Sequence, residues 1–473
     1  MRSSHLGRGK MVVGVMSGTY ARKIALKVVG RVRRDGAWAH EALASELKGS
    51  TAETREIALA TRLALGTLEM GGVLDEILAR HLSAPDRLQP QLMDVLRIAT
   101  YELLFLDTPA HAAVHQAVEL AGAVNPRAKA LANAVLRKVA KDAPDFPFGD
   151  PEVELSARAR LRGFPGWLAD RLAAKSGVQC AMDFMDAHAS SAPVYVSHNP
   201  FLGEEDALIE MVRESGADLL KCGPPGCFRC DPPALALAST AIAAGRGVVV
   251  DMAAQAIVAM APIEPGMRVA DIGAGRGSKT LLMQANALRK GGLAEIIAVD
   301  LHEFKVEVLR NRMRDLGVPK VTAIRADATD FDELISATGG PVDVAFVDAP
   351  CSGAGTLRRN PEKRWRMNTA DISRLAALGA KLLDSAARLV RPGGFVVYST
   401  CTVFSEENDQ VVDDFLSTST GEEFVKVDLL LPAEWSLISS AAQEGVFATW
   451  PSTDGPDGHF AAALRRKPLP TAL

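Results

Sequence analysis

Cysteine and long hydrophobic runs are both scarce in this chain of 473 residues. Six cysteines are too few for the disulfide framework of a small secreted protein, so free thiols in a reducing compartment are expected. No segment reaches the roughly 18 consecutive apolar residues that a membrane span requires. No small-residue cleavage site follows the short apolar run from Met11 to Met16. The sequence therefore predicts a cytoplasmic protein with no membrane partner.

A large excess of charge of one sign is also absent. The net charge of −4 argues against non-specific coating of DNA. The basic residues are clustered, however. No acidic residue precedes Asp35 in an N-terminal stretch rich in arginine and lysine, and a second basic group runs from Arg358 to Arg366. Such groups can bind phosphates, although a solvated helix face explains the N-terminal one equally well.

Three patterns divide the chain. Apolar residues at helical spacing predict a helical bundle over residues 18–142, which a proline-rich segment ends. Residues 152–246 predict a small α+β module, whose role the pattern does not give. Residues 247–467 alternate strands and helices, with strand candidates at 269–272, 296–300, 321–326, 342–348 and 395–399. This alternation predicts a Rossmann-like α/β domain with a doubly wound parallel sheet.

A glycine-rich turn follows the first of these strands, and acidic residues close the next two. The turn consists of Gly273, Ala274, Gly275, Arg276, Gly277, Ser278 and Lys279. Its glycines allow a ligand to approach the backbone closely. Asp300 could accept hydrogen bonds from ribose hydroxyls, and Asp327 could meet an adenine amino group. This set fits a nucleoside, and a dinucleotide would use the same turn for its pyrophosphate.

Two cysteines follow later strands of the same domain. Cys351 lies in Asp348-Ala-Pro-Cys-Ser-Gly, and Cys401 lies in Ser-Thr-Cys-Thr. The carboxyl ends of parallel strands open onto the ligand crevice, so two thiols at two such ends can face one substrate. A single cysteine is more often a small buried hydrophobe. Together with their polar flanks, the two cysteines indicate a catalytic pair. S-adenosylmethionine brings a nucleoside and a methyl group, and it therefore explains such a pair better than a dinucleotide does.

The motifs resemble those of the RsmB/Sun/Fmu-type RNA cytosine-5 methyltransferases. The run from Asp348 to Trp365 is similar to the family's fourth motif, and the run from Ser399 to Asn408 is similar to its sixth. The helical region, with His111–Leu120 and Asn133–Arg137, resembles NusB-like RNA-binding domains, and Asp457–Phe460 resembles the family's closing strand. The glycine-rich turn departs from the family's usual Cys-Ala-Ala-Pro-Gly-Gly-Lys-Thr but retains the last two residues.

The resemblance implies methylation of carbon 5 of a cytosine in ribosomal RNA, most simply the 16S RNA, by a monomer that uses S-adenosylmethionine. It implies that Cys401 attacks carbon 6, while Cys351 assists removal of the carbon 5 proton and release of the enzyme. Asp348 could hydrogen-bond the cytosine edge as well as contact the cofactor, and Lys279 is a candidate for lowering the pKa of Cys401. The target cytosine should be unpaired or flipped out of its helix.

The basic group after Cys351 is expected to contact RNA. Its candidate phosphate ligands are Arg358, Arg359, Lys363 and Arg364. Trp365 could either stack on a base or pack under the loop, and the sequence does not separate the two.

Two further residue groups have competing interpretations. Cys222, Cys227 and Cys230 invite a zinc site, but a closed structural site needs four ligands, so an ordinary turn without metal is expected. His111 and His115 share a helix face without a third ligand nearby, and we interpret them as ordinary bundle residues.

Alternative functions remain open at this stage. A non-catalytic, antitermination-like RNA-binding protein would need the helical region alone, and the altered glycine turn favours it. A tRNA cytosine-5 methyltransferase would share the same motifs. A small-molecule or protein methyltransferase would not need paired thiols. An amino-adenine methyltransferase would carry an Asn/Asp-Pro-Pro-aromatic run in place of Asp348-Ala-Pro-Cys, and that run is absent.

Overall fold

The computed structural model describes residues 17–469 apart from 430, 433–434, 436–437, 439–441 and 444. The chain forms two compact units. The first comprises Met1–Ala189 together with the short segment Asn360–Arg366, and the second comprises Ser190–Arg359 and Met367–Leu473. Among the described residues, no single helix is both long and apolar enough to span a membrane, although the bent pair Thr54–Glu69 and Gly71–Ala79 reaches that size and composition together.

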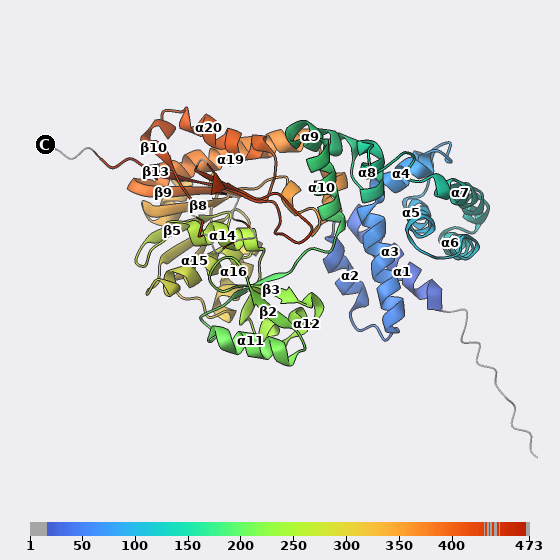
Figure 1. The fold of residues 1–473 in the computed structure, drawn as a ribbon, viewed down its shortest axis with the longest axis horizontal. Coiled ribbons are helices and arrows are strands. Elements are labelled where there is room, and N and C mark those ends of the chain that lie inside the picture. The colour runs from blue at the N-terminus through green and yellow to red at the C-terminus, as the bar shows by residue number, and fades with distance from the viewer. Residues whose placement is uncertain are drawn as a thin grey trace, which may run out of the picture. The chain divides into compact units, whose positions relative to one another are not determined.

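The first unit is helical (Figure 1). Its helices are α1 (Ser17–Arg34), α2 (Ala39–Leu47), α3 (Thr54–Glu69), α4 (Gly71–Ala79), α5 (Pro90–Phe105), α6 (Ala110–Val124), α7 (Lys129–Asp142), α8 (Leu155–Arg162), α9 (Gly166–Ser176), α10 (Val178–Ala189) and α18 (Lys363–Arg366). Helix α5 begins with Pro90, which is preorganised for the first helical turn, and its residues from Leu92 to Glu102 are buried. The predicted helical bundle is confirmed, with α5 at its centre.

The structure divides the predicted module of residues 152–246 at Ala189. Its helices α8 to α10 belong to the first unit, where Phe164, Phe184 and His188 pack their rings on one another. The remainder forms a four-stranded antiparallel sheet in the order β2-β3-β1-β4. Its elements are β1 (Tyr195–His198), α11 (Glu205–Glu214), β2 (Asp218–Lys221), β3 (Cys227–Asp231), α12 (Pro233–Ala238), α13 (Thr240–Ala243) and β4 (Gly247–Val249).

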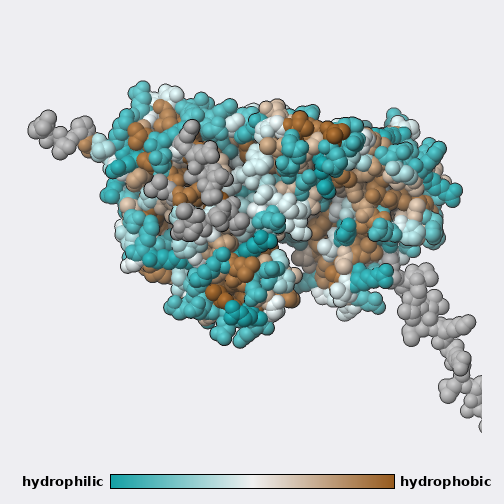
Figure 2. Space-filling model, in the orientation of Figure 1, coloured by the Kyte–Doolittle hydropathy of each residue, from teal (hydrophilic) through white to brown (hydrophobic). Residues whose placement is uncertain are grey.

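The small sheet carries apolar side chains on its surface. Figure 2 shows this hydrophobic area over the part of the molecule that holds β2, β3 and α12, where Leu220, Leu235 and Leu237 are all exposed. Its core lies beneath, around Val196, Phe228 and Leu208.

A larger mixed sheet, in the order β11-β12-β13-β9-β8-β5-β6-β7 with β10 paired to β13, fills the rest of the second unit. Its strands are β5 (Arg268–Ile272), β6 (Glu295–Asp300), β7 (Val321–Arg325), β8 (Val342–Asp348), β9 (Val390–Thr400), β10 (Phe424–Val427), β11 (Ala442–Gln443), β12 (Val446–Ala448) and β13 (Phe460–Arg466). Strands β5 to β9 are parallel, as predicted, and β13 joins β9 antiparallel.

Helices cover both faces of this sheet. They are α14 (Met252–Met260), α15 (Ser278–Arg289), α16 (Glu303–Asp315), α17 (Phe331–Thr338), α19 (Thr369–Leu389) and α20 (Asp409–Leu416). One apolar core contains Leu281 and Leu309 from α15 and α16, and the other contains Leu334 and Leu383 from α17 and α19. The strand order reverses between β5 and β8, so the crevice at their carboxyl ends is the expected ligand position.

Candidate active site

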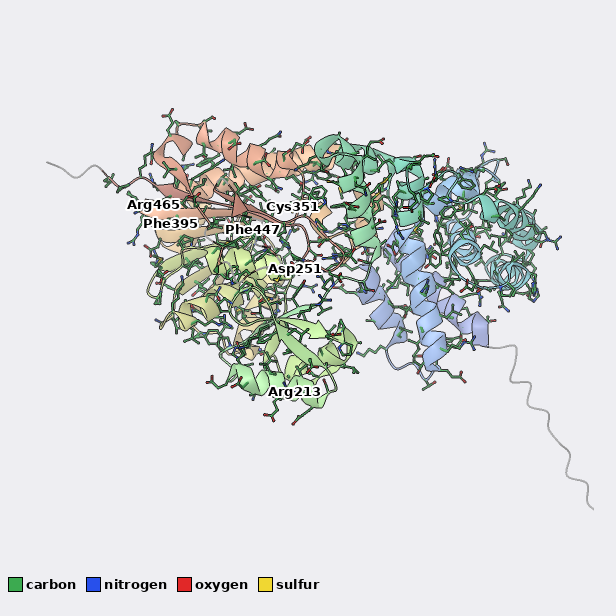
Figure 3. All side chains as sticks on the ribbon, in the orientation of Figure 1. Arg213, Asp251, Cys351, Phe395, Phe447 and Arg465 are labelled. Atoms are coloured by element: carbon green, nitrogen blue, oxygen red, sulfur yellow. The ribbon has the colours of Figure 1, made fainter. Side chains whose placement is uncertain are left out.

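Two cysteine side chains meet at the carboxyl ends of β8 and β9. Cys351, which is labelled in Figure 3, lies just beyond Asp348, the last residue of β8. Cys401 directly follows β9. Their sulfur atoms are 3.3 Å apart, and the backbone N–H of Cys401 donates to the sulfur of Cys351 at 3.3 Å. The adjacent parallel strands thus bring together the two thiols that the sequence places 50 residues apart.

The two thiols are not equivalent. The hydrogen bond to Cys401 raises the pKa of the Cys351 thiol well above its ordinary value, and burial acts in the same direction. Cys351 therefore keeps its proton and can donate it in a hydrogen bond to Cys401. The direction of this hydrogen bond favours Cys401 as the sulfur that carries the negative charge.

An ion pair stands beside the thiols. The Nζ atom of Lys279 in the first turn of α15 lies 2.6 Å from Oδ2 of Asp348. Burial alone would lower the pKa of Lys279, but Asp348 raises it above its ordinary value, and the charge on Cys401 acts in the same direction. Lys279 is therefore a persistent cation whose field reaches Cys401.

Hydrogen bonds tie the two cysteine loops together. Glu407 accepts from the backbone N–H and the hydroxyl of Ser352, both at 2.6 Å, and the Ser352 hydroxyl lies 2.9 Å from that of Thr402. Asn408 accepts from the hydroxyl of Thr400 at 2.5 Å and donates to the carbonyl of Thr402 at 3.1 Å. Glu407 and Asn408 lie in the run that resembles the family's sixth motif. Their hydrogen bonds tie the loop of Cys351 to the loop of Cys401.

A close backbone approach fixes the loop after Cys351. The N–H of Gly355 donates to the carbonyl of Cys401 at 3.0 Å, and the N–H of Gly458 donates to the carbonyl of Gly355 at 2.8 Å. A Cβ atom on Gly355 would lie 2.0 Å from the carbonyl oxygen of Gly458. Glycine is therefore required at 355 by contact distance.

A cavity of about 500 Å³ opens beside the thiols. Its lining includes Gly273, Asp300, Asp327, Asp348, Cys351 and Cys401, together with Leu301, His302, Thr329, Arg374 and Leu375. The volume is typical of small-molecule sites. Two carboxylates on neighbouring strand ends and apolar side chains from β6 and α19 match a ribose and a planar base.

The two acidic residues predicted at strand ends are held in defined positions. Asp300 accepts from the N–H groups of Gly275 at 3.2 Å and His302 at 3.0 Å. Asp327 accepts from the hydroxyl and the N–H of Thr329, and these bonds lower the pKa of Asp327. Both carboxylates can accept hydrogen bonds from a ligand.

The glycine-rich turn enters the cavity wall at its first residue, and its cofactor contacts stay a prediction. Of its seven residues only Gly273 lines the cavity, whereas Ala274, Gly275, Arg276, Gly277, Ser278 and Lys279 do not. The turn continues into α15, and Arg312 donates to the carbonyl of Arg276 and the hydroxyl of Ser278, both at 2.9 Å. The later residues thus shape the turn and position Lys279.

The structure corrects the predicted set of phosphate ligands. The Arg358 side chain is fully buried, lies 2.6 Å from Asp457 and also donates to the carbonyls of Ser452 and Gly455. Arg359 is 28% exposed and pairs with Asp457 and Asp251. Arg358 therefore has no surface to offer RNA, and the prediction for it is wrong.

Arg364 is likewise fully buried, in the first unit. It donates to the carbonyls of Arg162 at 3.0 Å and His188 at 2.9 Å, and it lies 3.3 Å from Glu69. The prediction that Arg364 contacts phosphate is therefore also wrong. Of the two alternatives for Trp365, packing and base stacking, the structure shows packing. Its indole N–H donates to the carbonyl of Glu69 at 2.7 Å, and its ring packs against the core of the first unit. Lys363 stays partly exposed and remains a candidate.

Asp251 and His459 are residues that the sequence did not single out for the site. Their side chains are 3.9 Å apart and buried. Phe460 pairs with Thr400, so His459 stands opposite Cys401 at the strand ends. Burial lowers the pKa of His459, and so does the charge of Lys279. Asp251 acts in the opposite direction. The sequence carried only the signal of a closing strand at this position.

Comparisons with known proteins give a consistent result. Residues 257–465 match the family model described as 16S rRNA methyltransferase RsmB/F, and residues 19–141 match the NusB family. The chain is 32% identical over 467 residues to a Mycobacterium tuberculosis protein that carries a methyltransferase name, with 94% of this chain and 96% of the relative covered. It is 28% identical to the ribosomal RNA small subunit methyltransferase B of Klebsiella pneumoniae, covering 78% and 83%.

Solved structures share the fold. The crystal structure of PH0851 superposes with a TM-score of 0.77 at 24% identity, covering 96% of this chain and 100% of that one. NSun6 from Pyrococcus horikoshii, solved with SFG, gives a TM-score of 0.54 at 18% identity, covering 65% and 99%.

Proposed function

The chain belongs to the RsmB/F family of 16S rRNA methyltransferases, and from this premise we propose that it methylates carbon 5 of a ribosomal RNA cytosine through a covalent cysteine intermediate. Methyl transfer from S-adenosylmethionine is the activity of the family. The observation that carries the finer proposal is the contact between the Cys351 and Cys401 sulfurs at 3.3 Å, beside the Lys279–Asp348 ion pair.

The cavity beside the thiols fits the cofactor. We assign Asp300 to the ribose hydroxyls and Asp327 to the adenine edge, with Leu301 and Leu375 as apolar contacts for the base. When bound, S-adenosylmethionine supplies an electrophilic methyl group on a sulfonium ion. NSun6 from Pyrococcus horikoshii, which shares the fold, was solved with SFG.

Cys401 is the nucleophile in this proposal. Carbon 5 of cytosine is a poor nucleophile, so a thiolate must first add to carbon 6 and turn the ring into an enamine. Lys279 stabilises the Cys401 thiolate through its positive charge. Asp348 is one-third exposed toward the cavity and can hydrogen-bond the amino and ring nitrogen edge of the base.

Cys351 changes its role during the reaction. While Cys401 is charged, the hydrogen bond between the sulfurs keeps the proton on Cys351. Once Cys401 is bonded to carbon 6, its negative charge is gone, and Cys351 can release its proton to solvent. After carbon 5 has received the methyl group, the Cys351 thiolate accepts the carbon 5 proton, and the bond between carbon 6 and the Cys401 sulfur breaks to release the Cys401 thiolate. Only a base outside its helix can reach both sulfurs, so the substrate is an unpaired or flipped cytosine.

A gel assay for covalent RNA adducts tests the assignment. Wild type, Cys351→Ala and Cys401→Ala are incubated with unmodified small-subunit ribosomal RNA and S-adenosylmethionine and separated under denaturing conditions. Cys351→Ala should accumulate protein bound to RNA, because nothing removes the carbon 5 proton, and Cys401→Ala should form none. Cys180→Ala, at an exposed position of the first unit, serves as the control. An adduct in Cys401→Ala but not in Cys351→Ala would reverse the roles.

A further inference from the structure

A second pair of cysteines lies in the small antiparallel sheet. Cys222 follows β2, and Cys227 begins β3. Lys221 pairs with Phe228, so the two cysteines form the next cross-strand pair toward the turn, and the N–H of Cys222 donates to the carbonyl of Cys227 at 3.1 Å. Their sulfurs are 3.8 Å apart. Side chains opposite each other in antiparallel strands lie within the range that a disulfide bridges.

The turn between these cysteines is conformationally restricted. It reads Gly-Pro-Pro-Gly, with Gly223 and Gly226 at φ of 61° and 76° and with two prolines whose φ is fixed by their rings. The N–H of Cys227 donates to the carbonyl of Pro224 at 2.9 Å. The thiols are therefore held together by the backbone, and closing a disulfide there requires little loss of chain entropy.

The three cysteines of this region do not form a metal-ligand group. Over the part of the chain that the structure describes, no group of three or more His, Cys, Asp or Glu side chains is placed to hold an ion. Cys230 is buried three residues further along β3 than Cys227, where burial raises its pKa to about 11. Two of the three thiols in this region, Cys222 and Cys227, are in contact with each other.

The two thiols differ in the way that a reactive pair requires. The hydrogen bond from Cys227 lowers the pKa of Cys222, and the backbone N–H and charge of Arg229 add to this, against the effect of burial. The same hydrogen bond and burial raise the pKa of Cys227 well above its ordinary value. Cys222 is therefore the thiol that ionises more readily, and Cys227 retains its proton.

A small molecule can reach Cys222. A cavity of about 430 Å³ is lined by Lys221, Cys222, Cys227, Glu205 and Arg289, among others. Lys221 is paired with Glu205 at 2.7 Å, whereas Arg289 donates to the Asn286 side chain and the His198 carbonyl. The Arg289 guanidinium is therefore the charge that the cavity offers to a ligand carboxylate.

We propose that Cys222 and Cys227 form a thiol–disulfide exchange site that reacts with small disulfides bearing carboxylate groups. The Cys222 thiolate attacks one sulfur of the disulfide, forming a mixed disulfide and displacing one thiolate, which takes up a proton. Cys227 then loses its proton, and its sulfur attacks the sulfur of Cys222 and displaces the second thiolate. Two protein thiols are oxidised by two electrons, and the small disulfide is reduced to two thiols. This site is independent of the methylation proposed above.

Oxidised glutathione is the probe for a test on the full chain. After incubation and alkylation of the remaining thiols, peptide mass spectrometry identifies the state of each cysteine separately, so that Cys351 and Cys401 do not confuse the result. Wild type should contain an internal Cys222–Cys227 disulfide. Cys227→Ser should retain one glutathione on Cys222, and Cys222→Ser should carry none at Cys227. Cys230→Ser, the matched control, should behave like wild type.

Alkylation of the reduced wild-type chain supplies a measurement that needs no variant. At neutral pH, iodoacetamide should label Cys222 several-fold faster than the exposed Cys180, because the hydrogen bond from Cys227 lowers the pKa of Cys222 and the thiolate is the form that reacts. The proposal is overturned if glutathione modifies Cys180 and leaves Cys222 untouched, if the internal bond joins Cys222 to Cys230, or if Cys222 labels no faster than Cys180.

Discussion

The second unit contains two pairs of cysteines in almost equal sulfur contact, at 3.3 Å for Cys351–Cys401 and 3.8 Å for Cys222–Cys227. In both pairs one thiol holds its proton and hydrogen-bonds its partner. Their surroundings differ. The first pair borders a cavity with three carboxylates and a lysine nearby, at the ends of parallel strands, and the second borders an arginine-lined cavity at a hairpin turn. The surroundings, rather than the sulfur contact, therefore determine which reaction each pair can perform.

Removal of the nucleophile should have the largest effect and should separate the pairs completely. Cys401→Ala should lower the rate of RNA methylation by ~10³-fold or more, because the covalent route is lost. Cys222→Ala should leave that rate within a factor of about two. Transfer of a labelled methyl group from S-adenosylmethionine to RNA measures both. Equal losses in the two variants would mean that the hairpin pair takes part in methylation.

The charge beside the first pair should come next. Lys279→Gln should lower kcat by ~10²-fold, as expected when one preorganised charge is lost from an active site. It should also move the pH profile of Cys401 alkylation to higher pH, because the folded protein then lacks the cation that stabilises the thiolate. Alkylation of Cys222 in the same sample should not change. An unshifted Cys401 profile would remove Lys279 from the mechanism.

Backbone packing near the first pair should have a smaller effect on stability. Gly355→Ala should lower the free energy of unfolding by about 1–3 kcal/mol, because the new methyl group meets the Gly458 carbonyl. Gly166→Ala, where no atom lies within 4 Å of the added Cβ, is the control. Urea unfolding of both variants measures the difference. If Gly355→Ala unfolds like the control, the loop is not fixed by this approach.

The smallest expected effect concerns the second pair. Arg229→Gln should slow alkylation of Cys222 at neutral pH by about two- to threefold, because the Arg229 charge contributes less than the thiol hydrogen bond to the lowered pKa. The rate at Cys401 should stay constant. Labelling kinetics followed by mass spectrometry resolve the two sites, and a loss beyond tenfold would make Arg229 the dominant influence.

The pairing of Cys351 with Cys401 and the parallel sheet could be predicted because their signals are local. Strands β6 and β8 are largely apolar runs that end in Asp300 and Asp348, and β8 has the predicted bounds. Neighbouring parallel strands then bring their ends together without further information. The contact of Cys351 with Cys401 follows from strand order alone.

The fates of the arginines could not be predicted in the same way. Arg358 pairs with Asp457, 99 residues later, and Arg364 reaches Glu69, 295 residues earlier. The sequence of a basic run does not differ between a run that contacts phosphates and one that contacts internal carboxylates, since the carboxylate partners lie far away in the sequence. The same distance hides the contribution of Asp251 and His459 to the site.

The assignment of Asn360–Arg366 to the first unit has a consequence for synthesis on the ribosome. Glu69, Arg162 and His188 are made early, but the guanidinium that binds them all belongs to Arg364. At cellular translation rates these partners wait for ~10 s or more until that residue emerges. The amino-terminal unit is therefore completed only after the parallel strands β5 to β8 have been translated, and before β9 and β13 complete the second unit.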